Sequence, residues 1–208
     1  MRKYVALAVS FCPVNSLRVA LYRLLLGARI AGSARLGLGT VLATRTAIIG
    51  DAQIGRNNRF IKPFALTISD GVVIGNFNEF RSSGADTSAF CLLGRGVQIE
   101  DRHFLDATGG ITICDFARIA GRGTQFWTHG GQRETPAIVV GERCYIGSAA
   151  RISQGVTLAE NTYVGLGSVV VGSITEPGSL VLGNPGRVVK TGITARLSMV
   201  EQAREPQS

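Results

Sequence analysis

Aliphatic residues recur at every sixth position over a long stretch in the second half of the chain. The series runs Val140, Ile146, Ile152, Leu158, Val164 and Val170. A period of six is neither that of an α-helix, about 3.6, nor that of a β-strand, about 2. It is typical of a solenoid in which each hexapeptide supplies a short strand and a turn, and in which successive coils stack. The pattern predicts an all-β architecture of repeated coils.

The same spacing extends through most of the chain. Three hexapeptides would close a triangular coil of about 18 residues, with the apolar residue of each hexapeptide pointing inward. Gln125 is the one polar residue among the inward positions that this register predicts. The positions before the run from Val140 are Ile30, Leu36, Leu42, Ile48, Ile54, Phe60, Ile68, Ile74, Phe80, Leu93, Ile99, Leu105, Ile113, Ile119 and Gln125.

The period is interrupted four times. Extra residues follow Phe60, Phe80, Leu105 and Gln125, and the last interruption is the longest. It contains the segment F-W-T-H-G-G-Q-R-E-T-P. Insertions on a rigid scaffold are where binding and catalytic residues concentrate. We therefore expect functional residues between Gln125 and Val140.

The N-terminal residues have a helical pattern instead. Leucine and alanine residues would share one face of a helix that begins at Asn15 or Ser16; these are Leu17, Ala20, Leu21, Leu24 and Leu25. We expect this face to pack on the end of the solenoid or on a neighbouring subunit, with peripheral membrane contact as the alternative. The predicted organisation is a helical segment at 1–27, a β-helix at 28–190 and a C-terminal tail at 191–208, helical in part.

Composition narrows the choice of partners and compartment. The net charge is +8, but no dense basic run interleaved with aromatic residues is present, so no nucleic-acid partner is expected. The four cysteines form no C-x-x-C pair, which favours reduced thiols and a cytoplasmic location. The apolar start has no clear signal-peptide cleavage site, and no stretch reaches the ~20 apolar residues of a spanning helix. The inner face of a membrane is the alternative location.

Four motifs follow one another in the second half of the chain. They are T-H at 128–129, V-V-G-E-R-C-Y-I-G-S-A-A-R-I-S-Q-G-V-T-L, G-L-G-S-V-V, and G-N-P-G-R-V-V-K at 183–190. Together they resemble the hexapeptide-repeat acyltransferases, and their order is similar to the branch that contains the maltose, galactoside and colanic-acid O-acetyltransferases. The resemblance implies a left-handed parallel β-helix, a homotrimer, and an acetyl-CoA site in a groove between neighbouring subunits.

His129 is the candidate general base. The histidine base of the resembled family maps onto it, and the chemistry agrees, because acyl transfer to a hydroxyl needs a base that titrates near neutral pH. Such a base usually has an orienting acceptor on its other ring nitrogen. Asp106 is the first choice, since it lies 23 residues before His129, about one coil plus inserted residues. Glu134 and Asp101 are alternatives, and Asp106 could instead bind the acceptor or be a turn residue. His103 is expected to be structural.

Two residues of the longest interruption are candidates for acceptor binding. Trp127 could stack on a sugar ring, with plain packing as the alternative, and Glu134 could bind sugar hydroxyls. The sequence therefore predicts an acetyl-CoA-dependent O-acetyltransferase that acts on a sugar, a polysaccharide or a lipid-linked glycan. An amino-sugar N-acetyltransferase and a non-catalytic β-solenoid scaffold are the alternatives.

The resemblance also implies a donor site. It places Ser148 and Leu166 on the acetyl-CoA, and their separation of 18 residues corresponds to one coil. It places Arg187 and Lys190 near the CoA phosphates. No metal is expected, because the γ-class carbonic anhydrases that share this fold need three histidine ligands and the chain has two histidines.

Overall fold

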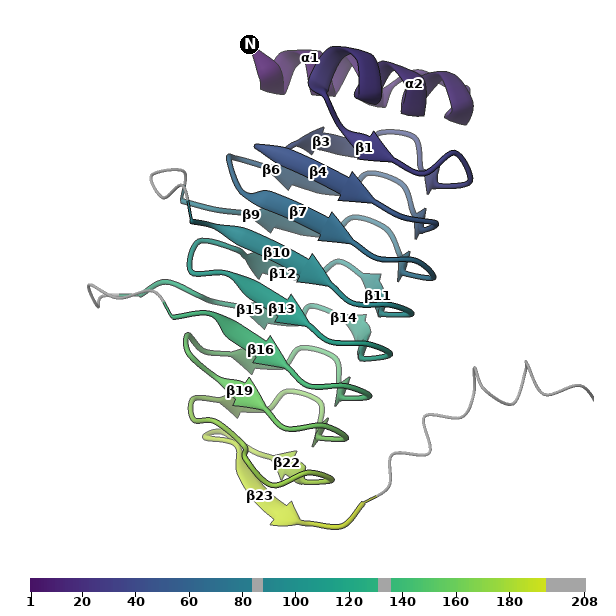
Figure 1. Cartoon of the computed structure of the whole chain (residues 1–208). Coiled ribbons are helices and arrows are strands. Elements are labelled where there is room, and N and C mark those ends of the chain that lie inside the picture. Colours follow the sequence, from purple (N-terminus) through teal and green to yellow (C-terminus); the bar gives the residue numbers. More distant parts are fainter. Residues whose placement is uncertain (84–87, 131–135, 194–208) are drawn as a thin grey trace, which may run out of the picture.

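The chain winds into a parallel β-helix with a triangular cross-section. The computed structural model describes residues 1–83, 88–130 and 136–193, and in it three sheets form the sides of a prism. Successive strands visit the three sheets in turn, so that three strands make one coil. In Figure 1 the chain descends while the front strands run from left to right and the rear strands return, which makes the coil left-handed. The predicted fold class is confirmed.

We name the three sides sheet A, sheet B and sheet C. Sheet A holds β1 (Arg29–Ile30), β4 (Thr46–Ile49), β7 (Ala65–Ile68), β10 (Phe90–Leu93), β13 (Ile111–Ile113), β16 (Ile138–Val140) and β19 (Thr157–Leu158). Sheet B holds β2 (Arg35–Leu36), β5 (Gln53–Ile54), β8 (Val73–Ile74), β11 (Gln98–Asp101), β14 (Arg118–Arg122), β17 (Tyr145–Ile146), β20 (Tyr163–Val164), β22 (Leu180–Leu182) and the antiparallel β23 (Arg187–Lys190). Sheet C holds β3 (Val41–Ala43), β6 (Arg59–Ile61), β9 (Glu79–Arg81), β12 (Phe104–Asp106), β15 (Gln125–Phe126), β18 (Arg151–Ile152) and β21 (Val169–Val170).

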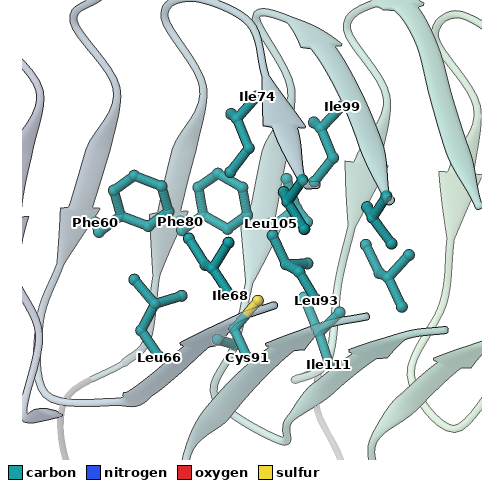
Figure 2. Close-up of a cluster of buried hydrophobic side chains, with 14 of the residues drawn as sticks. Phe60, Leu66, Ile68, Ile74, Phe80, Cys91, Leu93, Ile99, Leu105 and Ile111 are labelled. Carbon is teal, nitrogen blue, oxygen red and sulfur yellow. The ribbon is translucent and has the colours of Figure 1, made fainter. Parts of the chain in front are cut away.

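The core consists of columns of inward side chains. Equivalent residues of neighbouring coils lie opposite one another, as Phe60, Phe80 and Leu105 do along sheet C. The rings of Phe60 and Phe80 are stacked with centroids 4.5 Å apart (Figure 2). Both rings are fully buried. Each coil therefore supplies one layer of the core, and the sixfold period is the consequence.

Two of the predicted inward positions are wrong. Ile48 is exposed and its neighbour Ile49 is buried, while Gln125 is only half-buried and Phe126 is fully buried. In each case one extra residue in the preceding turn shifts the register. Because successive residues of a strand face opposite sides, a shift of one exchanges the inward residue for its neighbour. The remaining predicted positions are all buried.

The four interruptions of the period lie on one edge of the prism. They fall between β6 and β7, β9 and β10, β12 and β13, and β15 and β16. At each of these places the chain passes from sheet C to sheet A. We call this the C–A edge, and we call the edge where sheet B turns into sheet C the B–C edge. The described residues of these insertions therefore lie along a single side of the molecule.

Two helices, α1 (Arg2–Ser10) and α2 (Asn15–Leu26), lie across the end of the prism where β1 begins (Figure 1). The side chain of Asn15 donates to the carbonyl of Ala34 at 3.1 Å and accepts from the backbone N–H of Leu36 at 2.9 Å. The buried hydroxyl of Tyr22 lies 2.8 Å from the carbonyl of Thr40. These bonds satisfy backbone groups of the first coil, which has no strand above it.

The buried face of α2 differs from the prediction. It consists of Arg18, Val19, Tyr22 and Leu26, whereas most of the predicted leucine face is exposed and only Leu21 of that face packs partly against the core. Arg18 donates to the carbonyls of Cys12 and Leu36, so hydrogen bonding to the first coil decides which face turns inward. At the opposite end, β23 lies beside β22. The predicted helical tail falls almost entirely on residues 194–208, which lie outside the described residues.

Candidate active site

Asp106 is a buried carboxylate on the C–A edge, at the end of β12. Its Oδ1 accepts hydrogen bonds from the hydroxyl of Thr108 at 2.6 Å and from the backbone N–H of Thr108 at 3.3 Å. Its Oδ2 accepts from the backbone N–H of Thr128 at 3.2 Å. Burial raises the pKa of Asp106, but the bonds from Thr108 and His129 and the charge of His129 outweigh burial and hold that pKa below its usual value. Asp106 is therefore ionised at neutral pH.

His129 lies three residues beyond β15, one coil from Asp106. Its Nδ1 is 2.5 Å from Asp106 Oδ2. The side chain of His129 is 43% exposed, whereas that of Asp106 is 2% exposed. An ionised carboxylate can only accept a hydrogen bond, so Nδ1 carries the hydrogen and Nε2 of the neutral ring holds the lone pair. The two residues predicted to act together lie in direct contact; their catalytic roles remain a prediction.

An aromatic pair lies beside the histidine. The ring of Trp127 is 4.7 Å from that of Phe104 and 6.5 Å from that of His129. The indole N–H donates to Gln125 Oε1 at 3.0 Å, and Trp127 is still 41% exposed. One part of Trp127 therefore packs against Phe104 of sheet C and the rest is exposed. Stacking of Trp127 on a sugar remains a prediction.

Two other carboxylates were considered as partners of His129, and one of them, Asp101, belongs to the described residues. Asp101 lies at the end of β11, on the B–C edge, where its Oδ1 accepts from the backbone N–H of Asn76 at 2.6 Å. It is therefore on a different edge from His129. Glu134 lies outside the described residues, so its predicted roles remain predictions.

His103, the second histidine, is buried in a ladder of polar side chains on the B–C edge. Asn58 Oδ1 accepts from the N–H of Asn78, and Asn78 Oδ1 accepts from the N–H of His103, both at 2.8 Å. His103 Nδ1 continues the ladder by accepting from the N–H of Thr124 at 3.1 Å. Burial lowers the pKa of His103 to about 4. This environment agrees with a structural role.

Two of the residues predicted to bind the donor, Ser148 and Leu166, lie on the B–C edge. Ser148 and Leu166 occupy equivalent corners of neighbouring coils, where the N–H of Gly167 donates to the carbonyl of Ser148 at 2.9 Å. Leu166 is 81% exposed. Gly121 lies one coil above with φ of 66°, and a Cβ there would stand 1.8 Å from Ser148 Oγ, so no larger residue fits. A cavity of about 560 Å³ opens further along this edge, with Arg102 among its lining residues.

One subunit does not bring the predicted donor residues to the predicted base. Ser148 and His129 lie on opposite edges of sheet C, and five residues of extended chain separate those edges by about 15 Å. Arg187 and Lys190 lie farther along, on the exposed β23 at the end of sheet B. The structure thus groups the predicted residues into a C–A set and a sheet B set.

Comparison with known proteins identifies the fold. No model of a known protein family matches the chain. A hexapeptide-repeat-containing acetyltransferase of Vibrio cholerae in complex with acetyl-CoA is similar in structure, with a TM-score of 0.54, 20% identity, and coverage of 91% of this chain and 84% of that chain. The polySia-specific acetyltransferase NeuO gives a TM-score of 0.51 at 14% identity, with coverage of 84% and 87%. The chain has the fold of the hexapeptide-repeat acetyltransferases.

Two further similarities are to an N-acyltransferase and to a bifunctional protein. AntD, an N-acyltransferase of Bacillus cereus, gives a TM-score of 0.50 at 18% identity, with coverage of 85% of this chain and 86% of that chain. In sequence, the bifunctional protein GlmU of Clostridium acetobutylicum is 26% identical over 161 residues, which are 74% of this chain and 32% of that protein. The chain therefore spans about a third of the length of this curated relative.

Two threonines of the site escaped the sequence analysis. The hydroxyl of Thr128 lies 2.7 Å from the carbonyl of Asp106 and accepts from the N–H of Gly109 at 2.8 Å. The hydroxyl of Thr108 accepts from the N–H of Ser83 at 2.7 Å. Both threonines are buried and connect neighbouring turns of the C–A edge. The sequence did hold a signal for both roles. Thr128 directly precedes His129, and Thr108 lies two residues after Asp106.

Metal ligands do not gather in the described parts of the chain. No group of three His, Cys, Asp or Glu side chains within 1–83, 88–130 and 136–193 is placed to hold a metal ion.

Proposed function

We propose that the chain is an acetyl-CoA-dependent O-acetyltransferase whose acceptor is a hydroxyl of a sugar, a polysaccharide or a lipid-linked glycan. The pair formed by His129 and Asp106 carries the proposal, because a buried ionised carboxylate holds an accessible imidazole in the tautomer that a general base requires. The acetyl-CoA bound by the Vibrio cholerae protein supports the donor. The polySia specificity of NeuO supports a glycan acceptor.

In the proposed reaction His129 Nε2 takes the proton of the acceptor hydroxyl as the oxygen bonds to the acetyl carbonyl carbon. The imidazolium then gives that proton to the thiolate released when the C–S bond breaks. Asp106 stabilises the imidazolium and fixes the plane of the ring. Trp127 offers an aromatic surface on which the acceptor sugar can stack. The products are an acetyl ester and the free thiol of CoA.

The separation of the two predicted sets supports a homotrimer with sites between subunits. A donor lying along Ser148 and Leu166 would be about 15 Å from the His129 edge of the same subunit, so it would meet His129 of a neighbouring subunit. Arg187 and Lys190, at the end of sheet B, would bind its phosphates. Sedimentation should give a trimer, and a monomer would contradict this arrangement. Co-expression of His129→Asn with Leu166→Glu should restore part of the activity, since mixed trimers would contain intact sites.

N-acylation of an amino sugar is the second candidate function, favoured by the similarity to AntD. An amine acceptor would use the same base and the same donor. The products differ in chemistry, because hydroxylamine at mild alkaline pH cleaves an acetyl ester and leaves an acetamide intact. Treatment of the acetylated product with hydroxylamine therefore distinguishes the two functions.

The two histidines give a matched pair of variants for testing the activity. Acetyl-CoA is incubated with a panel of sugars, amino sugars and oligosaccharides, and thiol release and the mass of the acceptor are measured. His129→Asn should lower the rate by at least about a hundredfold, the typical contribution of a general base. His103→Asn should leave the rate unchanged. A His129→Asn variant with near wild-type transfer to a confirmed acceptor would refute the proposed mechanism.

A further inference from the structure

The outer surface of the helical cap is apolar. On α1 the exposed residues Tyr4, Leu7, Ala8 and Phe11 follow the spacing of a single helix face. Tyr4 and Phe11 present large rings, and Phe11 is 64% exposed. The opposite face of α1, with Ala6 and Val9, is buried. The exposed residues therefore have no packing role within the described part of the chain.

Helix α2 repeats this arrangement. Leu17, Ala20 and Leu24 are exposed on a single face of this helix, and Leu24 is 80% exposed. Leu25 beside them is also exposed. Both helices lie flat across the end of the prism (Figure 1). Since their other faces are buried against the first coil, the exposed apolar faces of both helices are on the side away from the prism. We call these two faces the apolar cap. Contiguous exposed apolar surface of this kind marks an interaction site.

The charge around the apolar cap has one sign. The first fifty residues contain no Asp or Glu, and their basic residues are Arg2, Lys3, Arg18, Arg23, Arg29, Arg35 and Arg45. A cavity of about 550 Å³ opens beside the N-terminus of α1, lined in part by Arg2, Lys3, Arg45 and Lys62. Lys3, Arg23 and Arg29 are exposed on or next to the two helices, whereas Arg18 is buried against the first coil. The accessible charge that borders the apolar cap is therefore basic, and a surface that is both apolar and anionic would complement it.

We propose that the apolar cap docks on a membrane surface that contains anionic lipids. An anionic bilayer offers hydrocarbon for the apolar faces and phosphate for the basic residues at the same interface. None of the described helices is long and apolar enough to cross a bilayer, and two short helices lying in the interface need no such length. A second copy of the chain is disfavoured as the occupant. It would bring an identical, purely basic segment against this one.

Docking places the candidate active site at a defined height. His129 follows β15, which is four strand spacings along sheet C from β3. With about 4.8 Å between strands and a helical layer about 10 Å deep, His129 lies about 30 Å from the lipid surface. Resting on the proposed function, this height specifies the acceptor: a hydroxyl several sugar units along a glycan whose other end is anchored in the membrane.

Vesicle binding tests the docking separately from the activity. The protein is sedimented, without acetyl-CoA, with phosphatidylcholine vesicles that contain or lack phosphatidylglycerol. We expect binding that requires phosphatidylglycerol and weakens as salt is raised. Leu17→Gln/Leu24→Gln keeps good helix formers on exposed positions and should weaken binding by at least about tenfold. Ile48→Thr/Leu92→Thr removes exposed apolar residues from sheet A and is the matched control, with binding unchanged. Lys3→Gln/Arg29→Gln should weaken the salt-dependent binding by about tenfold.

Hydrogen exchange of the wild-type protein gives a readout that needs no variant. Exchange in residues 1–27 should slow on adding vesicles with phosphatidylglycerol, and exchange in β19–β23 should not. Absence of vesicle binding, or equal binding by the Leu17→Gln/Leu24→Gln variant, would overturn the proposal. So would a loss of self-association in that variant without any effect on vesicle binding. His129→Asn should bind vesicles as the wild type does, so failure of the proposed activity and failure of docking are separate outcomes.

Discussion

One of the two histidines of the chain, His103, has a pKa that burial moves well below its ordinary value. His103 is buried, and its Nδ1 accepts from the N–H of Thr124. Its Nε2 has no hydrogen-bond partner among the described residues. Burial lowers its pKa to about 4 from the ordinary 6.5. Below about pH 6.5 the unfolded chain takes up a proton at this residue and the folded chain does not, so His103 must reduce the free energy of unfolding as the pH falls.

The magnitude follows from the two pKa values. Between about pH 7 and about pH 5, a pKa of 6.5 in the unfolded chain and about 4 in the folded chain gives a loss of about 2 kcal/mol. His103→Asn should remove this loss, because asparagine does not titrate. Asn58 and Asn78 occupy the equivalent positions of preceding coils and accept the same backbone bond. At about pH 7 the variant should therefore match the wild type within about 1 kcal/mol.

Two measurements test this prediction. Urea unfolding at fixed protein concentration across this pH range gives the stability of both proteins, and their difference isolates His103 from the carboxylates. The imidazole signals in NMR spectra give the titration directly, and the single signal of His103→Asn assigns His129. Two results would refute the reasoning. One is a His103 NMR signal that titrates near pH 6.5. The other is a free energy of unfolding that falls as steeply with decreasing pH in His103→Asn as in the wild type.

Three further predictions concern the site and the core. Asp106→Asn should lower kcat by about 10²- to 10⁴-fold with a small change in KM, because the amide no longer stabilises the imidazolium; steady-state kinetics with an unchanged kcat would return Asp106 to a turn role. Arg187→Ala/Lys190→Ala should raise KM for acetyl-CoA about tenfold at constant kcat through lost phosphate contacts, and an unchanged KM would make the two residues a solvated edge. Phe80→Ala should cost about 3–5 kcal/mol in urea unfolding, since it removes a stacked ring from the core, whereas a cost below about 1 kcal/mol would contradict the column packing.

The sixfold period predicted the coil because a repeating backbone puts the same requirement on every sixth side chain. It could not resolve Ile48 from Ile49, since both are aliphatic and the pattern accepts either. At Gln125 it could have done so, because the polar residue has Phe126 beside it. A polar exception in an otherwise apolar series is a signal that the register has shifted by one.

Periodicity is also insufficient to predict the packing of the helical cap and the contacts of the candidate site. Helical spacing shows which residues of α2 share a face and does not show which face is buried; the hydrogen bonds of Arg18 and Tyr22 to the first coil decide that. The approach of Asp106 to His129 followed from the length of one coil. The hydroxyl contacts of Thr108 and Thr128 depend on the conformations of two irregular turns, which no periodicity describes.

The distribution of insertions explains why the two sets of site residues lie on different edges. Steps from sheet B to sheet C are six residues long, except the seven from Ile119 to Phe126. Steps from sheet C to sheet A reach 14 residues, from Phe126 to Val140. The B–C edge is therefore a regular stack of corners, suited to an extended ligand such as a pantetheine arm, whereas the C–A edge has the irregular turns that position single side chains. The proposed acetyl transfer would need both surfaces at one acyl group. In a prism whose edges are held apart by sheet C, a neighbouring subunit is the direct way to combine them, which makes the co-expression of His129→Asn with Leu166→Glu the most informative experiment on the site.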